Sequence, residues 1–114
     1  MFSTDRQRLV ETVSSVLGEG KVALLAFPVD GAPDLPWAVY SDDPSVMGAD
    51  DGNWSVTHRW TVELYERQSD STLEERLLEA LAEVYGYVEP QGEIWNDDEG
   101  CYMVAFRFNE IKEM

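Results

Sequence analysis

The chain of 114 residues carries 23 acidic and 8 basic side chains, for a formal net charge of −15. Binding to phosphate depends on lysine and arginine, so this balance argues against a sequence-specific DNA-binding protein and against a protein held on an anionic membrane. Hydrophobic residues make up 44% of a length that suits one domain, so we expect a single folded domain over residues 1–114.

The N-terminal segment predicts an amphipathic helix from about Asp5 to Leu17. Its apolar residues follow the spacing of one helix face: Leu9, Val13, Val16 and Leu17. The segment lacks the basic-then-apolar order of a signal peptide, and the chain has no apolar run long enough to cross a bilayer. We therefore expect a soluble protein of a reducing compartment, in which the single Cys101 forms no internal disulfide.

Three strands are expected next, separated by turns. The apolar run 21–27 closes at Pro28, which favours a short buried strand, and Trp37–Tyr40 forms a second strand after a turn-rich segment. Residues 54–66 alternate between polar and apolar side chains, and this period of two predicts one long strand. The acidic stretch Ser41–Asn53 is expected to be an irregular loop, and a loop of this length in a small domain usually has a function.

A second helix and a hairpin complete the prediction. Ser71 and Glu74 have the spacing of a capping box, which predicts a helix that ends near Tyr85, before Gly86. The hairpin follows, with an acidic turn that leads into a strand at 101–108. The order α-β-β-β-α-β-β disfavours a doubly wound parallel sheet. We expect an α+β fold: one mixed or antiparallel sheet of about five strands, with two α-helices packed on one face.

The sequence shows no set of residues for enzymatic catalysis. Nucleophilic catalysis needs a nucleophile, a base and an orienting group. The only histidine, His58, lies on the Trp54 and Trp60 face of the long strand, where a core or rim residue is the simpler interpretation. One histidine and Cys101 cannot form a zinc site by themselves. We therefore expect no enzyme and no cofactor.

Adjacent acidic residues recur in three segments that are expected to be turns or loops: Asp42–Asp43, Asp50–Asp51 and 97–99. A hard cation could bind where two such segments meet. None of them matches the spaced oxygen ligands of a calcium-binding loop. Solvated turns are the simpler interpretation, so no metal site is assigned.

Five short motifs occur in an order and spacing that resembles the tail completion proteins of long-tailed bacteriophages. These proteins are also called tail terminators or tail-to-head joining proteins. The resemblance runs from about Leu35 to Ile111. Its motifs are the Pro-aromatic-x-Val-Tyr strand at 36–40, Ala49-Asp50, Glu63-Leu64-Tyr65, Leu73-Glu74-Glu75, and the Tyr-x-Val-x-Phe-x-Phe strand from Tyr102 to Phe108.

The resemblance implies a structural virion protein made in the host bacterial cytoplasm. Such proteins form a ring, usually a homo-hexamer, at the head-proximal end of the phage tail. The ring stops growth of the tube made by the tail tube protein and joins the tail to the head connector or stopper protein. DNA passes through the ring without sequence-specific binding, and an acidic channel wall would repel it.

The acidic loop is long enough to reach a neighbouring subunit, so we assign it to the subunit interface or the channel. The residues expected at this surface are Asp42, Asp43, Val46, Met47, Asp50, Asp51, Asp97 and Asp98. Two alternatives stay open. One is an acidic immunity or inhibitor protein that masks a basic nuclease or toxin surface. The other is the equivalent ring protein of a phage-like injection device or gene transfer particle.

Overall fold

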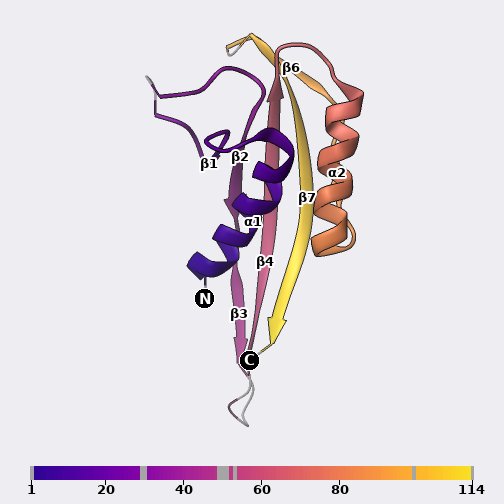
Figure 1. The fold of residues 1–114 in the computed structure, drawn as a ribbon. Coiled ribbons are helices and arrows are strands. Elements are labelled where there is room, and N and C mark those ends of the chain that lie inside the picture. The colour runs from indigo at the N-terminus through magenta and orange to yellow at the C-terminus, as the bar shows by residue number, and fades with distance from the viewer. Residues whose placement is uncertain (1, 29–30, 49–51, 53, 99, 114) are drawn as a thin grey trace.

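The structure of the chain is a computed structural model, which describes all residues except 1, 29–30, 49–51, 53, 99 and 114. The described part folds into two helices and one mixed sheet of seven strands (Figure 1). The expected α+β class is confirmed, but the sheet has more than the five strands expected. Neither described helix is long and apolar enough to cross a membrane.

The elements follow the chain in the order α-β-β-β-β-α-β-β-β. They are α1 (Phe2–Leu17), β1 (Val22–Leu24), β2 (Trp37–Asp42), β3 (Ser45–Gly48), β4 (Trp54–Glu66), α2 (Ser71–Tyr85), β5 (Glu89–Pro90), β6 (Ile94–Asn96) and β7 (Cys101–Glu113). The sheet runs β1-β2-β4-β7-β5, with β3 beside β4 and β6 beside β7. The pairing of β1 with β2 is parallel, and the other pairings are antiparallel.

The long strands β4 and β7 form the centre of the sheet and pair along almost their whole length. Shorter strands then share their outer edges end to end. β2 pairs with residues 60–65 of β4, and β3 pairs with residues 54–57 of the same strand. β6 and β5 divide the outer edge of β7 in the same way.

This pairing corrects the expectation of an irregular loop over Ser41–Asn53, because most of the described residues of this segment are in strands. Residues 41–42 continue β2 and residues 45–48 form β3. Pro44 has no backbone N–H to donate, so the edge is interrupted there. Pairing resumes at Ser45 because the first residues of β4 still offer unpaired backbone groups. The sequence of β3 has no alternating pattern, which is why it was missed.

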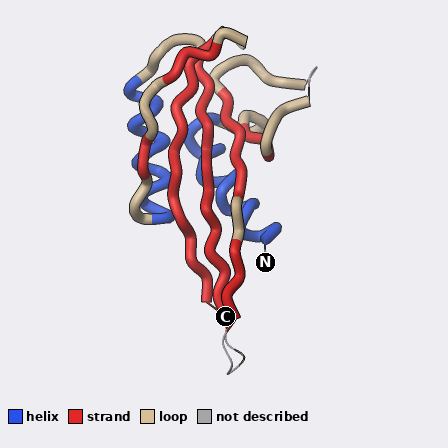
Figure 2. The backbone as a smooth tube through the Cα atoms, turned by 180° about the vertical axis from the view of Figure 1, so that it is seen from behind, coloured by secondary structure: helices blue, strands red, loops and turns tan. Residues whose placement is uncertain are grey.

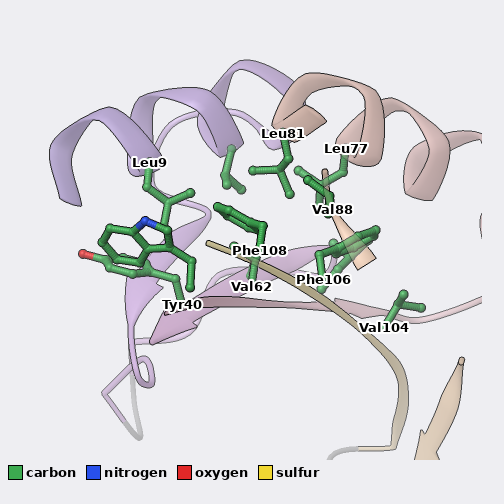
Figure 3. Close-up of a cluster of buried hydrophobic side chains, with 13 residues drawn as sticks. Leu9, Tyr40, Val62, Leu77, Leu81, Val88, Val104, Phe106 and Phe108 are labelled. Atoms are coloured by element: carbon green, nitrogen blue, oxygen red, sulfur yellow. The ribbon is translucent and has the colours of Figure 1, made fainter. Parts of the chain in front are cut away.

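Both helices cover the same face of the sheet, as expected, and Figure 2 shows the other face without a helix. The hydrophobic core lies between the helices and the sheet (Figure 3). Its fully buried members include Leu9 on α1, Leu77 and Leu81 on α2, and Val62 on β4. Phe106 and other side chains of β7 fill the space below α2. The matched apolar stripes of the two helices therefore meet one common sheet face.

Both helices end at the residues that the sequence indicated, but α1 begins at Phe2 rather than at about Asp5, and the cap of α2 is shifted by one residue. The N-cap of α2 is Asp70 rather than Ser71, and its Oδ1 accepts a hydrogen bond from the Leu73 N–H at 3.0 Å. Glu74 completes the reciprocal cap by accepting from the Asp70 N–H at 3.3 Å. At the other end Gly86 has a φ of 86°, a conformation that glycine adopts at little cost.

Candidate functional site

The sheet extends well beyond both helices at one end (Figures 1 and 2). There β3 pairs with the first residues of β4, and these pair with the last residues of β7. We call residues 45–48, 54–57 and 111–113 the projecting end. The protein is consequently elongated, with extents of 51 × 28 × 24 Å.

The projecting end carries three large hydrophobic side chains that are exposed. Val46 is 59% exposed, Met47 is 73% exposed and Ile111 is 67% exposed. Met47 and Ile111 lie on the sheet face without helices, because the alternate residues Val56 and Lys112 face the helix side. β3 is an edge strand, and such a strand can pair with a second chain. Exposed apolar side chains next to a free strand edge make this end a candidate interaction surface.

Those acidic residues expected at an interface or channel that the structure describes do not gather on one surface. Asp42 is the main difference: its side chain is buried inside this chain, so it cannot face a channel. Asp43 is exposed at the end of β2. Asp97 and Asp98 are exposed in the turn between β6 and β7, at the opposite end of the sheet. Asp50 and Asp51 lie outside the described residues.

The buried Asp42 belongs to a polar network at the base of the projecting end. His58 lies between two carboxylates: its Nδ1 is 2.6 Å from Asp42 Oδ2 and its Nε2 is 2.7 Å from Asp5 Oδ2. Lys112 donates to the other oxygen of Asp5. The imidazole also stacks on Trp60, with ring centroids 4.8 Å apart. The network thus joins α1, β2, β4 and β7.

The charges in this network balance one another. Burial alone would raise the pKa of Asp5, but hydrogen bonds from Lys112 and His58 outweigh it and hold that pKa below its ordinary value of 3.8. Asp5 is therefore ionised at neutral pH. The ammonium group of Lys112 thus stands against the negative charge of Asp5, and both ring nitrogens of His58 lie within hydrogen-bond distance of a carboxylate oxygen.

Asp5, His58 and Glu110 are close enough together to resemble a metal site. Their groups are already engaged, however. Both nitrogens of His58 face carboxylates, and Glu110 contacts Arg8 and the Trp60 indole N–H, each at 3.3 Å. His58 and Asp5 are also fully buried, so a substrate could not reach them. The arrangement is suited to fixing the first turn of α1 to the sheet at the base of the projecting end.

The sequence carried a signal for this network that was not used. Asp5 lies on the same helix stripe as Leu9 and Val13, four residues before Leu9. His58 likewise takes a core position in the alternating pattern of β4. A polar residue on an apolar stripe predicts a buried partner, because buried polar groups are almost always hydrogen-bonded. Lys112 carried no comparable signal.

In comparisons with known proteins, no protein-family model matches this sequence, and no curated protein is significantly similar to it. The function is therefore argued from the geometry of the chain and the order of its sequence motifs.

Proposed function

We propose that this protein is a structural subunit that assembles into a homo-oligomeric ring through its projecting end. The ring would end the growth of a phage tail tube and join the tail to the head connector, while DNA passes through its channel. The assignment to a tail is supported by the order of the sequence motifs that resemble tail terminators. The assignment to an oligomer is supported by the projecting end.

The single observation that carries the proposal is the exposure of Val46, Met47 and Ile111 on strands that no helix covers. Burying apolar surface is favourable by about 25 cal/mol per Å². A monomer does not gain this free energy from side chains that stay in water. A second copy of the chain would cover them. In a closed ring of more than two subunits this surface meets a different surface of the next subunit, and the same pair of surfaces repeats around the ring.

The net charge of −15 per subunit opposes the assembly of such a ring. Like-charged subunits repel one another, and this repulsion is screened by salt. The Debye length falls from about 10 Å at 0.1 M salt to about 3 Å at 1 M. Ring formation by the purified protein should therefore increase with salt. The same charge would give the channel a negative wall along which DNA slides without binding.

The test is the mass of the protein in solution, alone and mixed with tail tubes, measured by light scattering after gel filtration. We expect a species of about six times the 12.9 kDa subunit mass, and rings in electron micrographs at one end of the tubes. A protein that stays monomeric in high salt and with tubes would contradict the proposal. Tight binding of that monomer to a basic nuclease or toxin would instead support the inhibitor function.

Variants of the projecting end locate the contact. The double change Val46→Ser and Met47→Ser should weaken ring formation and leave the thermal midpoint of the monomer nearly unchanged, because both side chains are exposed there. The matched control is Ile94→Ser, which removes a 55% exposed side chain from β6, at the opposite end of the sheet. Normal rings from the double variant would show that the contact lies elsewhere.

A further inference from the structure

The carboxylate of Glu66 is buried without a partner. Glu66 is the last residue of β4 and is only 2% exposed. Neither of its oxygens has a hydrogen-bond partner among the described residues. Glu74 lies close enough to affect it, but the pair does not have the geometry of a hydrogen bond. A buried polar group in this state costs free energy, and such groups usually have an explanation.

Two further carboxylates surround Glu66. Glu74 comes from the first turn of α2 and Glu93 from the segment between β5 and β6. One oxygen from each of the three residues lies within 4.8 Å of the others. Three separate segments of the chain therefore each place a carboxyl group at the same point.

Among the described residues, no ion pair joins Glu66, Glu74 or Glu93 to a basic side chain, although Arg67 lines the same pocket as Glu66. Burial raises the pKa of Glu66 to about 8, and the neighbouring carboxyl groups of Glu74, Asp70 and Glu93 raise it in the same direction. No lysine or arginine is among the groups that act on it. The cluster is thus a concentration of negative charge that a proton or a bound cation must relieve.

We propose that Glu66, Glu74 and Glu93 form a binding site for a hard divalent cation, with Ca²⁺ as the preferred ion. Carboxylate oxygens are the ligands that such ions take. Ca²⁺ suits the site because it accepts six to eight oxygens in flexible geometry, so water can complete the shell, whereas Mg²⁺ requires a nearly regular octahedron.

The distances fit one shared ion. Two oxygens on opposite sides of a Ca²⁺ ion are separated by about 4.8 Å, twice a bond length of about 2.4 Å. The three ligand oxygens lie within this limit. Oε2 of Glu74 accepts from the Asp70 N–H and Oε2 of Glu93 accepts from the Ser69 hydroxyl, so Oε1 of each remains for the ion.

An ion can reach the site from solvent. Glu66 lines a surface pocket of about 420 Å³ together with residues 67–70, Leu35, Pro36 and Leu73. Ser69 and Asp70, which hydrogen-bond to Glu93 and Glu74, line the same pocket. The bound ion would tie the end of β4 to the start of α2 and to the β5–β6 segment. The site lies at the opposite end of β4 from the projecting end, and the proposal does not depend on ring formation.

Isothermal titration of the purified chain with CaCl₂, after treatment with a chelator, tests the proposal. We expect one site per chain and a weaker response to MgCl₂. No saturable binding of CaCl₂, or binding of MgCl₂ with equal affinity, would contradict the proposal.

Three variants decide whether the ion binds at these residues. Glu66→Gln and Glu93→Gln should each weaken Ca²⁺ binding at least about tenfold, because each removes a charged ligand. Glu93 is exposed, so that variant remains informative if Glu66→Gln folds poorly. The matched control is Glu75→Gln, an equal change of charge on the exposed side of the same helix turn, which should change affinity less than twofold. Equal affinities for all four proteins would mean that Ca²⁺ binds only to the general negative charge, and would overturn the proposal.

Discussion

Asp5 and Glu66 are both buried carboxylates in the same acidic chain, yet their surroundings are opposite. Asp5 accepts from the imidazole of His58 and from the ammonium group of Lys112, and its pKa is lowered. Glu66 has three acidic neighbours and no cationic one among the described residues, and its pKa is raised to about 8. Burial acts in the same direction on both groups. The neighbours decide which protonation state each carboxyl group adopts at neutral pH.

The comparison shows how a chain with few cations uses them. Both partners of Asp5 lie on the long central strands, where they hold α1 against the sheet at the base of the projecting end. Among the described residues, no basic side chain forms an ion pair with Glu66 at the other end of the sheet. There we propose that a divalent cation from solution takes the place of a basic side chain.

Asp5→Ala should give the largest loss of stability. It leaves His58 and Lys112 without their shared acceptor, and removing one partner of a buried ionic network costs about 3 to 5 kcal/mol. Unfolding in urea measures the change. The control is Glu11→Ala on the exposed face of the same helix, which should change stability by less than about 0.5 kcal/mol. A loss from Asp5→Ala as small as that of the control would show that the network contributes nothing.

Glu66 should make the folded protein less stable as pH rises. Its pKa is about 8 in the folded protein, against an ordinary value of 4.5. Between these values the folded state binds more protons than the unfolded state. The stability that this pKa shift contributes is therefore fully present below about pH 4.5 and is lost as the pH rises through about 8. At about 1.4 kcal/mol per pKa unit, we expect a loss of about 4 kcal/mol between about pH 5 and pH 9. The sign is opposite for Asp5, whose lowered pKa gives stability that disappears only in acid.

Urea unfolding of the parent and of Glu66→Gln, from about pH 5 to 9 with a chelator present, isolates this contribution. The difference between the two proteins should grow in favour of the variant as pH rises. Glu75→Gln should follow the parent throughout. Parallel profiles for the parent and Glu66→Gln would mean that Glu66 titrates in the folded protein as it does in the unfolded chain. Added CaCl₂ should reduce the loss of stability of the parent alone at high pH.

His58→Gln should have a smaller effect than Asp5→Ala. Glutamine can donate to one of the two carboxylates but cannot serve both, so one hydrogen bond is lost at a cost of about 1 to 3 kcal/mol. Since His58 is fully buried, assembly of infectious particles should remain essentially intact. A variant that folds with normal stability but abolishes particle assembly would point to a chemical role for the histidine.

Lys112→Met should have the smallest effect. The side chain of Lys112 is 34% exposed, so solvent screens its interaction with Asp5, and methionine keeps the apolar stem. We expect a loss of about 1 kcal/mol, measured by urea unfolding. The loss should shrink in about 1 M NaCl. A loss as large as that of Asp5→Ala would mean that Lys112, rather than His58, is the main partner of the carboxylate.

The elements with a clear period were predicted from the sequence. The alternation at 54–66 is a local property of the side chains, and so are the apolar stripes that place Leu9 and Leu77 in the core. The glycine that ends α2 and the acidic turn before β7 act through their own backbone preferences. These features led to the correct fold class and to the correct placement of both helices on one face of the sheet.

The remaining features depend on contacts between residues far apart in the chain. β3 forms because the first residues of β4 offer a free edge, so its own sequence need not alternate. Asp42 was expected at an outer surface but lies buried against His58, because the pairing of β2 with β4 brings it next to Trp60, two residues from the histidine. Asp5 and Glu66 take core positions in the patterns of α1 and β4, but nothing local in the sequence shows which groups surround them.

What the sequence determined by itself is therefore the period of each long element and the sign of the net charge. Only the tertiary structure decided which acidic side chains are buried and which of those have a cation beside them. The physical reason is that the protonation state and ion binding of a carboxyl group depend on charges within a few ångströms of it. For Asp5 those charges come from residues 53 and 107 positions away, and the fold alone brings them together.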